Sequence, residues 1–127
     1  MTDHHKKYSH TPIRRLINAF RFSLDGYAAT FKHEAAFRQE VFLAAILIPI
    51  ALLVDVSAVA RALMIGSIFL TLIVELLNSA IEAIVDRVSL ELHPLSKRAK
   101  DIGSGAVLIS LINVVVIWAL VLLERYG

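Results

Sequence analysis

Residues 103–123 form an unbroken apolar run, GSGAVLISLINVVVIWALVLL, without a single charged side chain. A helix of this length covers about 30 Å, which is the thickness of the hydrocarbon core of a bilayer. Two further apolar stretches precede it, at residues 41–60 and 62–85. The sequence therefore predicts an all-α membrane protein with three transmembrane helices.

The composition supports this class. Hydrophobic residues make up 57% of the 127 residues and charged residues only 19%, and the mean hydropathy is +0.70. A soluble domain has a smaller apolar share. The length suits a single domain over residues 1–127, and the absence of cysteine excludes disulfides and thiolate metal sites. We expect no nucleic-acid partner.

The N-terminal region has a different pattern. Thr11 and Pro12 are typical of a helix start, as N-cap and first helical residue. Apolar residues then recur at steps of three and four, with basic residues on the opposite side, which is the pattern of an amphipathic helix on a membrane surface. Residues 1–40 are therefore predicted to be an amphipathic surface region.

Basic residues are unevenly distributed. Seven precede the first predicted span, one lies in the first connection, four lie in the second and one lies near the C-terminus. The positive-inside rule then places the N-terminal region and the 86–101 connection in the cytoplasm. With three spans, the C-terminus is expected on the opposite side of the membrane.

The second apolar stretch carries acids near its end, in VELLNSAIEAIVD at 74–86. On a helix, five polar side chains of this segment fall within about 100° of arc: Glu75, Asn78, Ser79, Glu82 and Asp86. A carboxylate at the centre of a bilayer costs roughly 2.5–3.5 kcal/mol, so a stripe of acids indicates function more than stability. Glu75 and Glu82 lie about 10 Å apart along the helix axis and therefore suit different roles.

Three interpretations of the stripe remain open. The acids could be hydrated at the interface and paired with basic residues, or they could line a path for cations or protons. They could also form a metal-assisted phosphoryl-transfer site, in which Glu82 binds Mg²⁺ and Lys100 and Asp101 of the following connection supply a phosphate contact and a carboxylate. The nearest candidates for a second metal ligand are Glu34 and Glu40.

Familiar nucleotide-binding loops are absent from the sequence. There is neither a Walker A loop nor a G-x-G-x-x-G motif. The GSG segment at 103–105 is weak as a phosphate cradle, and close packing at a helix start is the better interpretation. His33 and His93 could be metal ligands, but solvated histidines at the membrane interface are the commoner outcome.

Three motifs together closely resemble the small prokaryotic diacylglycerol kinase family: EAAFRQE at 34–40, VELLNSAIEAIVDR at 74–87 and RAKDIGSGAVL at 98–108. The similarity follows chain order over nearly the whole length. It implies a homotrimeric helical bundle in the bacterial inner membrane, with one surface helix and three transmembrane helices per subunit. It also implies composite active sites between subunits, a cytoplasmic N-terminus and a periplasmic C-terminus. The implied reaction is transfer of the γ-phosphoryl group of ATP, with Mg²⁺, to the hydroxyl of diacylglycerol, which yields phosphatidic acid.

The resemblance also implies roles for individual residues. Glu75 would be the general base, and Asn78 would help to place the base and the substrate. Glu34 and Glu82 would hold the metal ions that bridge the ATP phosphates, and Lys100 would contact phosphate. The other positions that match the nucleotide site are Arg15, Phe22, Glu91, His93 and Asp101.

The chain departs from the family pattern at a few positions. Phe22 stands where relatives can have tyrosine, so a hydroxyl contact to ATP would be lost, and Leu92 and Lys97 replace an aromatic and a small residue. The acceptor could instead be a polyprenol such as undecaprenol. From other classes, the chain could be a small cation-conducting oligomer or a non-catalytic assembly subunit.

Overall fold

The computed structural model describes residues 11–88 and 93–127, and it is helical throughout these ranges apart from short caps and one connection. The helices are α2 (Pro12–His33), α3 (Ala35–Leu53), α4 (Ala58–Val88) and α5 (Pro94–Tyr126). The predicted all-helical class is confirmed within the described residues. The chain divides into two compact units, Met1–His33 and Glu34–Gly127, each of which is described by itself.

Helix α2, in the first unit, begins where the sequence predicts. The backbone N–H of Arg14 donates to Thr11 Oγ1 at 3.4 Å, and the N–H of Arg15 donates to the Thr11 carbonyl at 3.0 Å. Thr11 therefore caps the first turn, and Pro12 occupies a position where its missing N–H is not needed. The helix ends at His33, whereas the surface region was predicted to continue to residue 40.

The break after α2 has a local cause. Glu34 has an extended backbone, with φ −117° and ψ 109°, and it stands at the N-cap position of α3. Residues 35–40 consequently belong to α3. The predicted boundary at residue 40 reflected where charges end, but the break between the two helices lies at the extended residue Glu34.

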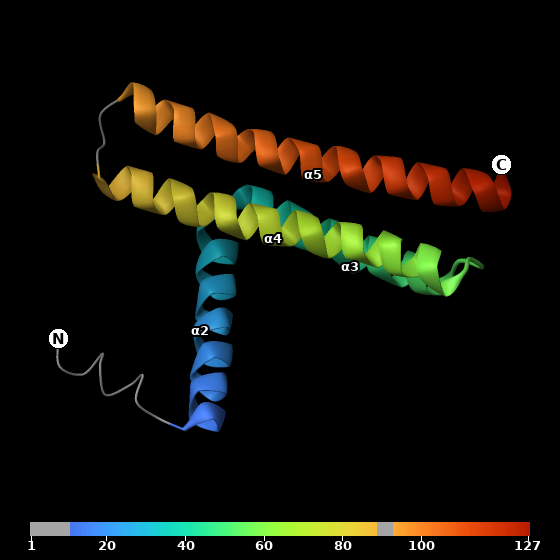
Figure 1. Ribbon diagram of the computed structural model, residues 1–127, viewed down its shortest axis with the longest axis horizontal. Coiled ribbons are helices and arrows are strands. Elements are labelled where there is room, and N and C mark those ends of the chain that lie inside the picture. The colour runs from blue at the N-terminus through green and yellow to red at the C-terminus, as the bar shows by residue number, and fades with distance from the viewer. Residues whose placement is uncertain (1–10, 89–92) are drawn as a thin grey trace. The chain divides into compact units, whose positions relative to one another are not determined.

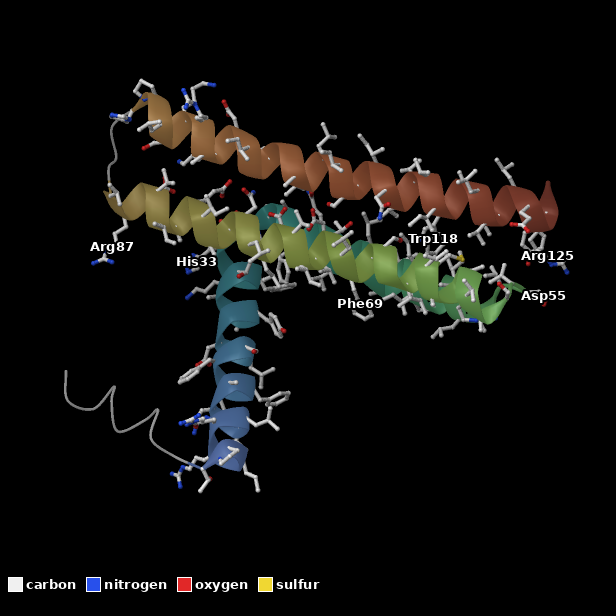
Figure 2. The ribbon with its side chains drawn as sticks, viewed as in Figure 1. His33, Asp55, Phe69, Arg87, Trp118 and Arg125 are labelled. Carbon is white, nitrogen blue, oxygen red and sulfur yellow. The ribbon has the colours of Figure 1, made fainter. Side chains whose placement is uncertain are left out.

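The described helices of the second unit form a bundle in which α4 packs against both α3 and α5, and neighbouring helices run antiparallel (Figure 1). Its core consists of Ala44, Ala51, Met64, Ile68 and Trp118. The small side chains of Ala44 and Ala51 allow α3 to approach α4 closely. Trp118 Nε1 donates to the Met64 carbonyl at 3.2 Å, which joins α5 to α4 in the interior (Figure 2).

The outer surface of this bundle is apolar. The helices α3, α4 and α5 are each long and apolar enough to cross a membrane, and large side chains such as Phe42, Phe69 and Leu120 are more than half exposed. Exposing so many large apolar side chains to water is unfavourable, and three helices are long enough to span a bilayer, so the chain is a membrane protein. With 31 residues, α4 is about 46 Å long and exceeds the roughly 30 Å hydrocarbon core.

The first predicted span, residues 41–60, has different bounds in the structure. Helix α3 ends at Leu53 and α4 begins at Ala58. The N–H groups of Ala60 and Arg61 donate to Ser57 Oγ at 3.1 Å and to the Ser57 carbonyl at 2.9 Å. Ser57 therefore starts a new helix, because its hydroxyl satisfies an N–H group that the first turn leaves without a partner.

Arg61 completes this connection from the other side. Its guanidinium donates to four backbone carbonyls, those of Ala51 at 2.7 Å, Leu52 at 2.9 Å, and Val54 and Val56 at 3.1 Å each. The last carbonyls of a helix lack intrahelical donors. Arg61, which served only as a topology signal in the sequence, is thus a side-chain cap for the end of α3.

The second and third spans are longer in the structure than the predicted ranges 62–85 and 103–123. Helix α5 already begins at Pro94, where His93 Nδ1 accepts a hydrogen bond of 3.1 Å from the N–H of Leu95. His93 is the N-cap of this helix, and Pro94 suits its first position. Lys100 and Asp101, which were expected in a connection, therefore lie on α5.

Candidate functional site

The predicted polar stripe belongs to the buried face of α4. The buried residues of this helix follow steps of three and four: Met64, Ser67, Ile68, Thr71, Glu75 and Asn78. Glu75 is only 4% exposed and Asn78 only 8%. Further along, Glu82 is half-buried and Asp86 is exposed. One face of α4 therefore passes from the apolar core to an acidic site and then to the surface.

Glu40 of α3 faces this stripe. Its side chain is 8% exposed, and its carboxyl group interacts electrostatically with the Glu75 carboxyl group. The sequence presented Glu40 only as one of two alternative metal ligands. Burying two neighbouring carboxyl groups in a low-dielectric interior costs free energy of folding. The pair of Glu40 and Glu75 is therefore a candidate functional site.

Asn78 lies between the two glutamates of its own helix. Its Nδ2 donates to Glu82 Oε1 at 3.4 Å, while its Oδ1 and the nearby Ser79 Oγ are buried and have no hydrogen-bond partner among the described residues. Glu40 Oε2 shares this condition. Buried polar atoms nearly always have hydrogen-bond partners, so these three oxygens are candidate contacts for a bound ligand.

Glu34 extends the same group of acids. It precedes the first residue of α3, makes no side-chain cap hydrogen bond and interacts electrostatically with Glu75, as Glu82 does. Glu34, Glu40, Glu75 and Glu82 are hereafter called the acidic cluster. It draws on the start of α3 and the second half of α4.

The acidic cluster suits a magnesium ion only in part. Within residues 11–88 and 93–127, no group of three or more His, Asp and Glu side chains is arranged to hold a metal ion. Mg²⁺ is commonly held by one or two carboxylates together with substrate phosphates and waters. The carboxylates of Glu34 and Glu82 fit that kind of site, and their assignment as ligands stays a prediction.

The first turns of α5 bring basic residues to the end of α4. Lys100 Nζ lies 2.5 Å from Asp86 Oδ1 and also interacts electrostatically with Glu82. Lys97 Nζ lies 2.6 Å from Asp101 Oδ2. All four paired side chains are substantially exposed, and such pairs contribute little to stability. Lys100 can therefore exchange Asp86 for a ligand phosphate at small cost.

The other predicted nucleotide contacts have mixed outcomes. His93 has a structural role as the N-cap of α5. Arg15 and Phe22 lie on α2, which forms its own unit, and Phe22 is 54% exposed. Glu91 lies outside the described residues. The contacts of all four to ATP stay predictions.

An apolar cavity of about 40 Å³ lies next to the acidic cluster. Residues of α3, α4 and α5 line it, and Glu40 and Thr71 are its polar members, with Leu43, Leu47, Leu72 and Val114 among the apolar ones. Its lining can accept a hydrocarbon group beside a carboxyl group. The sequence alone did not indicate this cavity, because three helices contribute to it.

All four residues of the acidic cluster lie within the part of the chain that matches known proteins. The model of the prokaryotic diacylglycerol kinase family matches residues 21–122. A Pseudomonas aeruginosa protein named diacylglycerol kinase is 59% identical over 113 residues, which are 89% of this chain and 92% of that protein. The Escherichia coli K12 protein of the same name is 48% identical over 92% of this chain and 96% of its own length. A Helicobacter pylori diacylglycerol kinase is 42% identical over 90% of this chain and 89% of its own length.

Proposed function

The chain belongs to the prokaryotic diacylglycerol kinase family, and on that basis we propose that it phosphorylates diacylglycerol with ATP to give phosphatidic acid. The observation that carries this proposal is the 59% identity, over almost the full length of both chains, to a protein named diacylglycerol kinase. The acidic cluster and the neighbouring apolar cavity support it, because a lipid alcohol needs a carboxylate beside a hydrocarbon surface.

In the proposed reaction, Glu75 accepts the proton of the lipid hydroxyl while the hydroxyl oxygen attacks the γ-phosphorus of ATP. The bond from the γ-phosphorus to the β–γ bridging oxygen breaks, and ADP leaves. An alcohol is a weak nucleophile, and a positioned general base typically contributes about 10²–10⁴-fold to the rate. Asn78, one turn further along α4, orients the base and the substrate.

The charge of the phosphates has to be balanced at the same place. Mg²⁺, held by Glu34 and Glu82, would neutralise charge that develops on the phosphoryl oxygens. Lys100 leaves Asp86 and donates to a phosphate oxygen, while Asp101 lies beside it in the nucleotide site. Arg15, Glu91 and His93 complete the proposed nucleotide contacts, and Phe22 provides an aromatic surface without a hydroxyl.

We also propose the assembly and orientation that the family implies. The chain forms a homotrimer in the bacterial inner membrane, with active sites composed of residues from neighbouring subunits. Helix α2 lies on the cytoplasmic surface, where its basic residues meet anionic headgroups, and the C-terminus is periplasmic.

Phosphoryl transfer is tested with purified protein in lipid micelles, Mg²⁺, γ-labelled ATP and a panel that contains diacylglycerol and undecaprenol. We expect label on diacylglycerol and no more than traces on undecaprenol. Preferential labelling of undecaprenol would make the chain a polyprenol kinase. Absence of label on every lipid would refute the kinase function, and a liposome flux assay without ATP would then test cation conduction.

The role of the base is tested in the same assay with Glu75→Gln. We expect this variant to lose transfer by about 10²-fold or more, because the amide cannot accept the proton. ATP binding, measured separately by equilibrium dialysis, should stay close to that of the unmodified protein. Unchanged transfer would remove Glu75 from the mechanism.

A further inference from the structure

Gly103 of α5 is buried directly against Asn78 of α4. A Cβ atom added at Gly103 would collide with Asn78 Oδ1 and would lie 3.1 Å from Asn78 Cγ. Real Cβ atoms do not tolerate such a collision with Oδ1, so Asn78 would have to turn away. The Asn78 amide therefore occupies the space that the missing side chain of Gly103 leaves open.

Few other contacts hold the Asn78 amide in this orientation. Its hydrogen bond from Nδ2 to Glu82 Oε1 is long, at 3.4 Å, and its Oδ1 has no hydrogen-bond partner in the part of the chain that the structure describes. A bond of this length is weak. The orientation of the amide therefore also depends on the space at Gly103 that Asn78 Oδ1 occupies.

The other helical glycines of this unit show that the requirement is specific. A Cβ atom at Gly105, two residues along the same helix, would meet nothing within 4 Å, and the same is true of Gly66 in α4. A glycine inside a helix costs about 1 kcal/mol relative to alanine. At Gly105 an alanine would be accommodated without strain, whereas at Gly103 it would displace a side chain of the proposed active site.

We propose that Gly103 is a positioning residue for phosphoryl transfer, because it makes the room in which Asn78 is held between Glu75 and Glu82. This assignment rests on the proposed function, since Asn78 and Glu82 matter as parts of the kinase site. It adds Gly103 to the α5 residues already proposed for the site, Lys100 and Asp101. Because Gly103 has no side chain, α5 can approach α4 closely at Asn78.

The test compares Gly103→Ala with Gly105→Ala in the full chain, in lipid micelles. Gly103→Ala is expected to lower kcat by about ten- to hundredfold, because small displacements of positioned groups have effects of that size. It should also raise the Mg²⁺ concentration needed for half-maximal rate, since Asn78 bonds Glu82. Gly105→Ala should keep kcat within about twofold. A Gly103→Ala enzyme with normal kcat would overturn the inference and leave the kinase function intact.

A second measurement reports on Asn78 without activity. In ¹⁵N-labelled protein, the side-chain amide resonance of Asn78 should shift in Gly103→Ala and stay in place in Gly105→Ala. An unmoved resonance in Gly103→Ala would overturn the inference. Loss of phosphoryl transfer in the unmodified protein would instead refute the proposed function, and the positioning role with it.

The final comparison separates positioning from a general packing defect. In Asn78→Ala protein the displaced amide is gone, so adding Gly103→Ala should lower kcat no further. If Gly103→Ala alone lowers the thermal unfolding midpoint, the double variant should regain it, because alanine at position 78 leaves room for the new methyl group. Additive losses of kcat or of stability in the double variant would contradict the inference.

Discussion

At the scale of single residues, Lys100 has two alternative partners, the Asp86 carboxylate and a phosphate group of ATP. In the structure it pairs with Asp86 at 2.5 Å, and in the proposed reaction it donates to a phosphate. Both side chains of the pair are about half exposed, so the pair itself contributes little to stability. A lysine forms charge-assisted hydrogen bonds to carboxylates and to phosphates alike. The two partners can therefore be separated by changing each side of the ion pair in turn.

Lys100→Met should raise the KM for ATP about tenfold or more, because hydrogen bonds to charged groups are worth about 1.5–3 kcal/mol. Asp86→Asn removes the same ion pair but keeps the lysine, so the KM for ATP should stay within about threefold. Initial rates at saturating Mg²⁺ and diacylglycerol, with ATP varied, measure both. An equal rise of KM in the two variants would show that the ion pair matters and not a phosphate contact.

At the scale of helices, the sequence predicted which segments are helical better than where they end. Long apolar runs indicated membrane-spanning helices, and Thr11 and Pro12 correctly marked the start of α2. The other ends depend on side chains that bond the backbone, as Ser57 does at the start of α4 and His93 at the start of α5. Ser57 was readable as an N-cap, but the apolar residues around it concealed the signal.

Arg61 is the clearest case of an end that the sequence could not reveal. It is the donor for carbonyls up to ten residues earlier in the chain, and such contacts exist only once α3 and α4 have folded back on each other. Its single positive charge had indicated topology alone. Two of the four carbonyls that it bonds, those of Ala51 and Leu52, belong to the last turn of α3, where carbonyls lack intrahelical donors, so the arginine holds the connection together.

Arg61→Met keeps the apolar stem but removes all five donors, and it should lower the free energy of unfolding by about 2 kcal/mol. Arg61→Lys should lose less, because it keeps a charge but not the planar arrangement of donors. Denaturant unfolding in micelles, followed by circular dichroism, measures the loss. Arg87→Met, at the exposed end of α4, is the control and should change stability by less than about 0.5 kcal/mol. Equal losses at the two positions would contradict the capping role.

At the scale of the whole molecule, the sequence predicted the part of the candidate site whose residues all lie on one helix, α4. Glu75, Asn78 and Glu82 share a face of α4 because of helical spacing alone, and the structure buries that face. The contact of Glu40 with Glu75 and that of Gly103 with Asn78 depend on how far α3 and α5 slide along α4. That register follows from packing among residues far apart in sequence, so it could not be derived from spacing.

Polar contacts near both ends of α5 connect it to other segments of the chain. Near the start, Lys100 pairs with Asp86 of α4. At the far end, Arg125 donates from Nη2 to Asp55 Oδ2 at 2.5 Å and from Nε to the Asp55 carbonyl at 2.8 Å (Figure 2). The N–H of Asp55 donates to the Tyr126 hydroxyl at 3.3 Å. The contacts at Asp55 connect the last turn of α5 to the segment between α3 and α4.

The stabilisation from the ion pair between Arg125 and Asp55 should depend on pH. The hydrogen bond from Arg125 holds the pKa of Asp55 below its ordinary value, so the folded protein favours the ionised carboxylate. The resulting stabilisation is fully present above the ordinary aspartate pKa of about 3.9 and is lost as the pH falls through the lower value of the folded state. Asp55→Asn should therefore lower the thermal unfolding midpoint at neutral pH, and the difference from the unmodified protein should close in strong acid.

Thermal unfolding in micelles, recorded by circular dichroism for the two proteins from about pH 7 down to about pH 2, measures this difference. Both side chains of the pair are exposed, so the difference at neutral pH should be small and should shrink further in about 1 M salt. Arg125→Gln should lower the midpoint as Asp55→Asn does, and the double variant should fall little below either single one, because each change removes the same ion pair. A difference between unmodified and Asp55→Asn protein that stays constant across the whole pH range would show that the carboxylate charge does not hold the end of α5.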